Sequence, residues 1–355
     1  MILSQTALLI VCGLLLLLAV GTSFMSPFVR RPRLVPPEPG SRPRFSIVVC
    51  GHNNAAELDR NLPAFLTQQY EPGYEVIVVN ESSTDDTEDV LTRLQTAYPH
   101  LYTTFLPKDS HYVSRRKLAL TIGIKAAHNE WVVICSPDSY PETDNWLNTL
   151  AKYCADSTRL ACCFTGYAAD APAYYTFERL LMACHHMRFP YRYEGGGLAI
   201  RKPLFMQHNG FIRNLKYLRG ELDFLMNEYG DKDSIAVIDE PEGRMRQDAP
   251  TQRSWYNKHL FYMETRRHLQ HTLLPRLLFN TDQTALHLNC LIQLSALVYA
   301  AVFTNYVLLG TAIAAIILSV GLRTFMVKKT VRQLDANLPV WKIPFLELRV
   351  VWQNG

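Results

Sequence analysis

Short apolar segments alternate with amphipathic segments between residues 45 and 135, and this alternation constrains the fold more than any other feature of the sequence. The strand-like segments are 45–50, 75–79, 101–106 and 131–135, and the helix-like segments are 57–70, 84–98 and 115–128. Apolar runs of this length, bounded by turn residues, are typical of strands buried on both faces. We therefore predict an α/β fold with a mostly parallel, doubly wound sheet and right-handed crossovers.

Two long stretches without charged residues lie outside this region. No charge occurs in residues 1–29, and none occurs in the 40 residues from 283 to 322. The first stretch is long enough to cross a bilayer once. A helix of 40 residues would measure about 60 Å, twice the ~30 Å of the hydrocarbon core. The sequence thus predicts one N-terminal transmembrane helix and a C-terminal helical hairpin that turns near residues 304–305.

Basic residues follow both apolar stretches. The two clusters are Arg30, Arg31, Arg33, Arg42 and Arg44, and then Arg323, Lys328, Lys329 and Arg332. No basic residue precedes the first apolar stretch, where a secretory signal peptide would carry one. By the positive-inside rule, the N-terminus lies outside and the rest of the chain lies in the cytoplasm. We expect a multi-pass protein of the cell inner membrane.

The remaining segments complete the predicted domain organisation. Residues 30–43 are rich in proline and arginine and form a stiff linker, and residues 44–275 form a cytoplasmic domain. Residues 323–355 form a cytoplasmic tail whose amphipathic part lies on the membrane. The net charge is only +4, which argues against general nucleic-acid binding.

Polar side chains follow three of the predicted strands. Asn53 follows the first strand, Asn80 and Glu81 follow the second, and Asp138 follows the fourth. The carboxyl ends of parallel strands meet at one edge of a sheet, where open α/β folds bind their ligands. A carboxylate there suits a hard cation that bridges to phosphates, so Asp138 indicates a site for a phosphorylated donor. The alternative is that Asp138 only caps a helix within 142–153.

Two further groups are candidates with two interpretations each. Gly196 and Gly197 would allow a ligand to approach the backbone, or would form a hairpin loop. Arg267 and His268 close a basic, aromatic segment that would bind phosphate or rest on lipid headgroups. Asp85 and Asp86 are explained by a helix start with Thr84 at the N-cap.

Five segments in order resemble the family-2 glycosyltransferases of the A-type nucleotide-sugar-binding fold, especially membrane-anchored bacterial members. These segments are FSIVVCGHNNAAELDRNLPAFLTQQY, YEVIVVNESSTDDTEDVL, RRKLALTIGIKAAHNEWVVICSPDSYP, GGGLAIRKPLF and GELDFLMNE. The resemblance covers roughly residues 45–269. A dinucleotide-dependent oxidoreductase is a poor alternative, because no G-x-G-x-x-G motif follows the first strand.

The resemblance implies a role for each candidate residue. Asn53 and Glu81 would hold the uracil or ribose, and Lys117 would approach the nucleotide. Asp138 would ligate Mg²⁺ or Mn²⁺ on the diphosphate. The full set of implied donor-binding residues is Asn53, Asn80, Glu81, Lys117, Asp138, Gly196, Gly197, Arg267 and His268.

Two positions depart from the pattern of the family. Ser136 replaces the first acid of the metal-binding Asp-x-Asp turn, and Leu222 replaces the family's likely catalytic base. Glu221 and Asp223 are the remaining candidates for the base. The implied reaction is inverting transfer of a sugar from a UDP-sugar to a lipid-linked or polysaccharide acceptor. The alternative function is a catalytically impaired membrane subunit that acts as a binding or scaffold protein.

Overall fold

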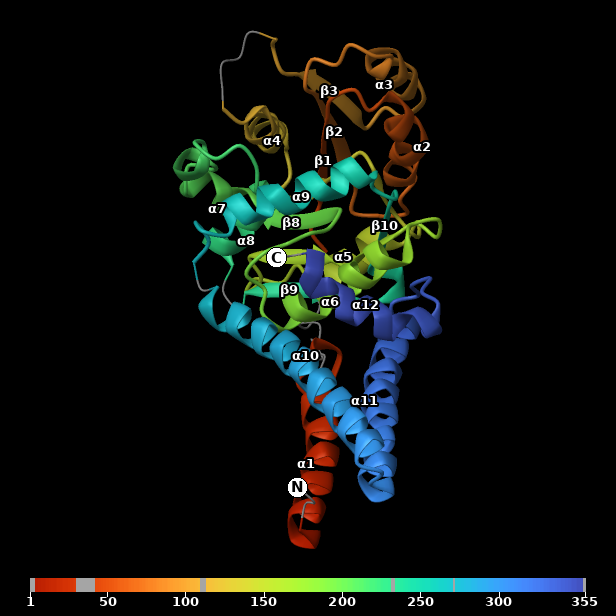
Figure 1. Ribbon diagram of the computed structural model, residues 1–355. Coiled ribbons are helices and arrows are strands. Elements are labelled where there is room, and N and C mark those ends of the chain that lie inside the picture. The colour runs from red at the N-terminus through yellow and green to blue at the C-terminus, as the bar shows by residue number, and fades with distance from the viewer. Residues whose placement is uncertain (1–3, 30–41, 109–112, 231–233, 271, 354–355) are drawn as a thin grey trace. The chain divides into compact units, whose positions relative to one another are not determined.

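The structure is a computed structural model that describes residues 4–29, 42–108, 113–230, 234–270 and 272–353. The chain forms two compact units, and Figure 1 labels most of their helices and several of their strands. The sheet unit comprises Arg33–Ala171 and Phe189–His271, and the helical unit comprises Met1–Pro32, Pro172–Arg188 and Thr272–Gly355. The predicted linker, residues 30–43, lies outside the described residues except for its last two.

A seven-stranded sheet forms the centre of the sheet unit, with the order β3-β2-β1-β4-β8-β6-β9. Its strands are β1 (Phe45–Gly51), β2 (Tyr74–Asn80), β3 (Leu101–Phe105), β4 (Trp131–Cys135), β6 (Leu160–Cys163), β8 (Gly197–Arg201) and β9 (Ile235–Ile238). Strand β8 runs antiparallel to both of its neighbours, and the other pairings are parallel. The predicted α/β fold with a mostly parallel sheet is thereby confirmed.

A second, three-stranded sheet holds the turn after β4. Its strands are β5 (Ser139–Pro141), β10 (Met245–Gln247) and β7 (Thr165–Tyr167), with β10 in the middle. Strand β10 pairs antiparallel with β5 and parallel with β7. Residues 139–141, directly after the Asp138 turn, are therefore fixed by a segment more than a hundred residues away in sequence.

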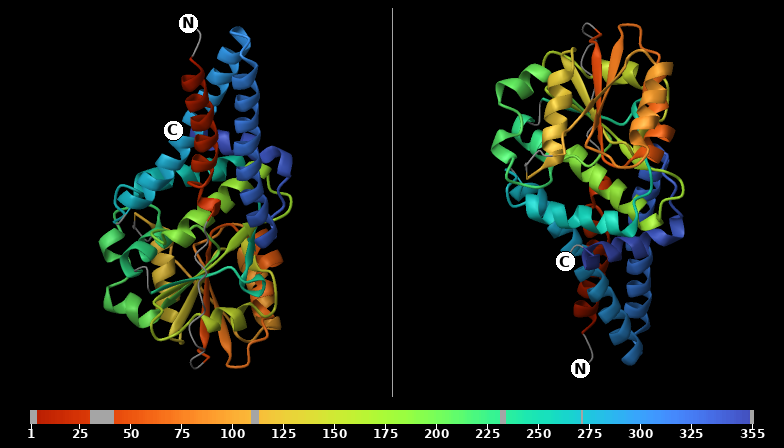
Figure 2. Two further views of the ribbon diagram at one scale, coloured as in Figure 1. Left: turned by 90° about the horizontal axis from the view of Figure 1, so that it is seen from below. Right: turned by 90° about the horizontal axis from the view of Figure 1, so that it is seen from above.

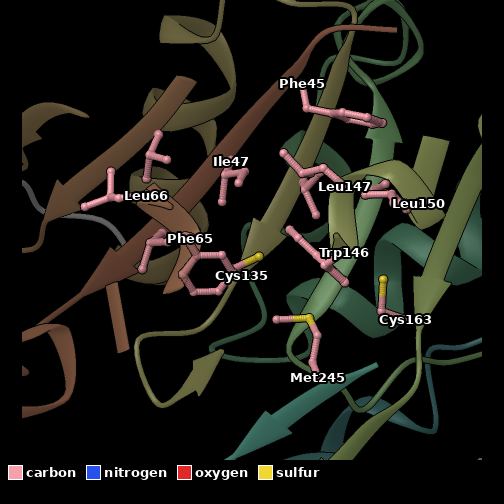
Figure 3. Close-up of a cluster of buried hydrophobic side chains, with 14 of the residues drawn as sticks. Phe45, Ile47, Phe65, Leu66, Cys135, Trp146, Leu147, Leu150, Cys163 and Met245 are labelled. Atoms are coloured by element: carbon pink, nitrogen blue, oxygen red, sulfur yellow. The ribbon is translucent and has the colours of Figure 1, made fainter. Parts of the chain in front are cut away.

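Helices cover both faces of the large sheet (Figure 2). The first face carries α2 (Ala55–Leu66), α3 (Thr87–Ala97) and α5 (Trp146–Lys152), and the second carries α4 (Arg115–Ala126), α7 (Lys202–Gln207) and α8 (Glu221–Tyr229). Alternate residues of β1 serve the two faces: Phe45 and Ile47 join the cluster around Trp146 (Figure 3), whereas Val48 packs with Leu120 on the other side. This two-sided burial explains why the strands are apolar without interruption. Helix α9 (Gln252–Thr265) completes the unit.

The helical unit contains three helices that are long and apolar enough to cross a membrane, judged by length and composition. They are α1 (Gln5–Ser23), α10 (Leu273–Val302) and α11 (Tyr306–Gln333), which pack together. Helix α10 begins ten residues before the charge-free stretch and so includes Asp282. The unit also contains α6 (Ala173–Arg188) and α12 (Ile343–Gln353), so a segment predicted to lie in the 44–275 domain belongs here instead.

A buried ion cluster joins the helices of this unit. Arg323 on α11 lies 3.2 Å from Asp282 on α10 and 3.1 Å from Glu347 on α12. Its Nη1 also donates a hydrogen bond of 3.1 Å to the carbonyl of Thr22 on α1. Buried charges require such pairing, because an isolated ion inside a protein loses its hydration.

Candidate active site

A cleft of about 1060 Å³ opens in the sheet unit at the carboxyl ends of β1 and β4. The chain continues from β1 toward β2 and β3 on one side, whereas β4 and β8 lie on the other. The strand order therefore reverses between β1 and β4, and ligands of doubly wound sheets bind at such a switch point. All residues that line the cleft belong to the sheet unit.

Asp138 lies in the turn that follows β4 and lines the cleft. Its Oδ2 accepts a hydrogen bond of 2.9 Å from Gln247 Nε2, and its carbonyl accepts one of 2.8 Å from the backbone N–H of Asp248. Its Oδ1 is buried and has no hydrogen-bond partner among the described residues. Helix α5 begins at Trp146 with Asn145 at its N-cap, so the alternative that Asp138 caps this helix is wrong.

The residues around Asp138 fit a magnesium-type ion that is held mainly by substrate phosphates. The described residues contain no group of three or more His, Cys, Asp or Glu side chains that could hold a metal ion. Ser136, which also lines the cleft, offers only a hydroxyl. Mg²⁺ commonly uses one or two carboxylates and completes its shell with water and phosphate oxygens. The unpartnered Oδ1 of Asp138 is therefore a suitable protein ligand, although not a sufficient one without substrate.

Glu81 and Arg116 form a partly buried ion pair in the cleft. Glu81 is 8% exposed, and its Oε1 lies 3.1 Å from Arg116 Nη1. The backbone N–H of Glu81 donates to the carbonyl of Gly51, and the His52 ring lies 3.0 Å from the Glu81 carbonyl. These contacts join the ends of β1 and β2, so the cleft presents both a carboxylate and a guanidinium at this edge.

Asn53 and Asn80 stabilise loops instead of lining the cleft. The Oδ1 of Asn53 accepts a hydrogen bond of 2.7 Å from the backbone N–H of Thr84, and Asn80 Oδ1 accepts one of 2.9 Å from Ser83. Because Thr84 is engaged in this loop, α3 begins only at Thr87, with Asp86 at the N-cap. The prediction of Thr84 as N-cap is wrong by two residues.

Lys117 does not line the cleft. Its side chain is completely buried, and its ammonium group donates hydrogen bonds to the carbonyls of Asn214, Tyr217 and Arg219, at 2.8, 2.5 and 3.3 Å. Burial lowers the pKa of Lys117 to about 8. The residue therefore holds the segment that leads into α8, and the preceding Arg116 lies in the cleft instead.

Gly196 and Gly197 are buried positions of close packing and do not line the cleft. A Cβ at Gly196 would lie 2.5 Å from Ser139 Cβ, and one at Gly197 would lie 2.4 Å from Met245 Sδ. At both distances the neighbouring side chain would have to shift to admit a Cβ. These glycines therefore favour the close approach of β8 to the small sheet, and their neighbour Gly195 lines the cleft.

The first turn of α8 contributes Glu221, Leu222 and Asp223 to the cleft. The helix starts after Gly220, whose φ of 87° favours glycine. Glu221 Oε1 is buried without a hydrogen-bond partner among the described residues. Asp223, in contrast, is 7% exposed and accepts hydrogen bonds from Arg192 Nε at 3.3 Å and from the Tyr193 backbone at 3.2 Å. Both hydrogen bonds end on Asp223 Oδ1, so a buried guanidinium holds this carboxylate, whereas no hydrogen bond or ion pair within the described part of the chain engages the carboxylate of Glu221.

Arg267 and His268 are exposed and do not line the cleft, and His268 stacks on the Tyr217 ring at 4.2 Å. Other cations line it instead, and sequence reasoning missed them: Arg115, Arg116, Arg192, Arg219, Arg253 and Lys258. In the sequence, the two adjacent arginines that precede Lys117 are the one indication that cations other than Lys117 could line the cleft from this helix. The cleft thus combines unpartnered carboxylate oxygens with several guanidinium groups, a combination that suits a cation and an anionic diphosphate.

The fold and this cleft together define a glycosyltransferase domain of the A-type fold. Residues 46–217 match the family model "Glycosyl transferase family 2", and we conclude that the chain carries a domain of this family. None of the curated proteins compared with the chain matches it.

One solved structure with a similar fold is that of a mannosyltransferase. The mannosyltransferase PcManGT from Pyrobaculum calidifontis, in complex with GDP-Man and Mn²⁺, is 17% identical, with a TM-score of 0.54. The match covers 88% of this chain and 98% of that one. Residues 1–349 of S. aureus TarS in complex with UDP-GlcNAc are 13% identical over 88% of both chains, with a TM-score of 0.47. At 17% identity, the similarity to PcManGT shows the shared fold alone.

Proposed function

We propose that the protein transfers a sugar, with inversion, from a nucleoside-diphosphate sugar to an acceptor hydroxyl in this cleft. The observation that carries the proposal is that two buried carboxylate oxygens in one cleft at the switch point, Asp138 Oδ1 and Glu221 Oε1, have no hydrogen-bond partner in the part of the chain that the structure describes. Unpartnered buried acceptors are unfavourable unless a ligand or ion completes them. Uridine as the nucleoside is proposed from the family resemblance of the β2 segment.

The leaving diphosphate would be stabilised by the positive side of the cleft. Arg115 and Arg116 at the start of α4, and Arg253 at the start of α9, supply guanidinium groups that suit phosphate oxygens. Asp138 would hold Mg²⁺ or Mn²⁺, which when bound neutralises charge on the diphosphate. Glu81 keeps Arg116 in place through their ion pair.

Glu221 is the residue that we propose as the general base. Its free Oε1 would accept the proton of the acceptor hydroxyl as that oxygen attacks the anomeric carbon from the face opposite the diphosphate. Asp223 is already engaged by Arg192, so taking a proton there would weaken a buried ion pair. In this assignment, turnover does not require an acidic residue at position 222, where this chain has Leu222.

The acceptor and the location are proposed from the architecture. Three apolar helices in the same chain favour an acceptor that is lipid-linked, or a polysaccharide that is built at the membrane. The basic clusters after each apolar segment favour the cell inner membrane, with the sheet unit in the cytoplasm.

A scaffold or binding subunit is the second candidate function, and Ser136 and Leu222 favour it. The first residue weakens the metal site, and Leu222 presents an apolar side chain at the family's base position. In that case, the cleft would bind a nucleotide sugar without turnover, or would bind nothing.

Donor turnover separates these functions. The full chain in detergent or nanodiscs is incubated with Mn²⁺ or Mg²⁺ and a panel of UDP-sugars, and sugar transfer or release of UDP is measured. We expect turnover by the wild type, a large loss in Asp138→Ala, and no change in Asp89→Asn, a matched control at an exposed carboxylate of α3. Equally negligible rates in the wild type and Asp138→Ala would support the scaffold and contradict the enzyme.

A further inference from the structure

Helix α9 presents an apolar stripe to the outside of the sheet unit. Tyr256, Leu260 and Met263 are 58%, 48% and 37% exposed. Their spacing of four and three residues places them on one face of the helix. The opposite face is already occupied, because Trp255 and Thr265 are only 8% and 1% exposed. Rotating the helix about its axis would bury the apolar stripe only by exposing Trp255 and Thr265. The stripe therefore stays on the outside of the sheet unit.

The segment before α8 lies beside α9 at the cleft. Arg219 lies 5.2 Å from the Phe261 ring of α9, and the adjacent Leu218 is 44% exposed. Leu218, Arg219 and Arg253 all line the cleft. We name the outer surface formed by Tyr256, Leu260 and Met263 the α9 surface.

The C-terminal end of the α9 surface is positively charged. Residues 252–270 carry four cations and one carboxylate, Glu264. Arg253 and Lys258 line the cleft, where Lys258 pairs with Glu194 at 2.9 Å, and Arg266 and Arg267 follow the end of the helix. An apolar stripe accompanied by basic side chains is typical of helices that lie in the interface of an anionic bilayer.

The chain itself keeps α9 close to a membrane. Helix α9 ends at Thr265 and α10, an apolar candidate span, begins at Leu273. The seven intervening residues, 266–272, can extend over at most about 25 Å. The α9 surface therefore has a bilayer within reach for as long as α10 is in the membrane.

We infer that the α9 surface lies on the membrane, with Tyr256, Leu260 and Met263 inserted among the headgroups of an anionic bilayer. The contact places the mouth of the cleft at the lipid surface. A membrane-borne acceptor would then reach Glu221 without leaving the bilayer, a consequence that rests on the proposed function, whereas the contact itself does not.

Site-specific labelling of the full chain in nanodiscs tests this contact. Seven of the eight cysteines are buried, so a Cys290→Ser background allows one cysteine to be introduced and labelled with an environment-sensitive fluorophore. Leu260→Cys reports on the α9 surface, and Thr92→Cys, at an exposed position of α3 in the same unit, is the matched control. Lipids with a nitroxide near the headgroup serve as the quencher, and no enzymatic activity is needed.

We expect blue-shifted emission and loss of most of the fluorescence at position 260, with neither change at position 92. Replacing anionic lipid by neutral lipid should reduce quenching at position 260. Equal behaviour of the two labels would overturn the inference. So would a label at position 260 that is shielded from iodide but not quenched by the lipids, because that result would indicate a protein partner or a second copy. Quenching that is independent of lipid charge would overturn the role of the basic residues.

Discussion

Replacing Glu221 by glutamine should remove turnover while leaving the fold intact. Glu221→Gln keeps the size of the side chain but removes its ability to take a proton. A general base contributes roughly 10²–10⁴-fold to the rate, which corresponds to about 3–5.5 kcal/mol of activation free energy. Because Glu221 Oε1 has no hydrogen-bond partner among the described residues, the free energy of unfolding should hardly change.

Asp223→Asn should show the opposite pattern. Its carboxylate accepts hydrogen bonds from the buried guanidinium of Arg192 and from the Tyr193 backbone. Hydrogen bonds that involve charged groups contribute about 1.5–3 kcal/mol, and we expect a loss of this size. In a domain of this size, the midpoint of thermal unfolding should fall by roughly 3–12 °C. Turnover below the new midpoint should change less than in Glu221→Gln.

The two variants are compared by kcat under saturating donor and by thermal unfolding of the full chain, with Asp89→Asn as control. Donor affinity, measured by calorimetry, should be retained in Glu221→Gln. A Glu221→Gln protein with wild-type kcat, beside an Asp223→Asn protein that has lost more than a hundredfold, would refute the assignment of the base.

Three further variants test other parts of the site. Asp138→Ala should raise the Mn²⁺ concentration needed for half-maximal turnover, as measured by metal titration; an unchanged titration would exclude Asp138 as a ligand. Lys117→Met should lower stability by roughly 1–3 kcal/mol, because three carbonyls lose their donor. Since burial lowers the pKa of Lys117 from its ordinary ~10.4 to about 8, the folded protein binds fewer protons than the unfolded chain in that window. The free energy of unfolding should therefore rise with pH across it, and less steeply in Lys117→Met; equal slopes in urea titrations would contradict this. Gly196→Ala should cost about 1–3 kcal/mol through overpacking against Ser139, whereas Gly310→Ala, where a Cβ meets nothing within 4 Å, should not destabilise in the same thermal assay.

The sequence was most informative where burial on both faces left a continuous apolar pattern. Strand β4 has the predicted bounds, β1 is one residue longer than predicted at its C-terminal end, and β2 is one residue longer at each end. The small sheet could not be predicted, because each of its strands has three residues and their pairing joins segments far apart in the chain.

The side chains of the site were predictable only in part. Asp138 and Glu81 follow strands whose ends are fixed by the sheet, and both line the cleft. Lys117 illustrates the limit, because successive helical residues point about 100° apart. Helix α4 begins with three cations, so the sequence alone does not show which of them faces the cleft.

Arg267 and His268 were expected near the diphosphate or the acceptor. They do not line the cleft, for a related reason. Helix α9 ends at Thr265, and the cations of this helix that line the cleft, Arg253 and Lys258, come from its earlier turns. Which turn of a helix faces a cleft depends on tertiary packing, and local sequence carries no signal for it.

A crystal structure of the full chain with a UDP-sugar and Mg²⁺ would test the central claim most directly. We predict the diphosphate between Arg116 and Asp138, the ion at about 2.0–2.1 Å from Asp138 Oδ1, and Glu221 beside the anomeric carbon on the face away from the diphosphate. A nucleotide bound elsewhere on the sheet unit, or an ion with no contact to Asp138, would contradict the account.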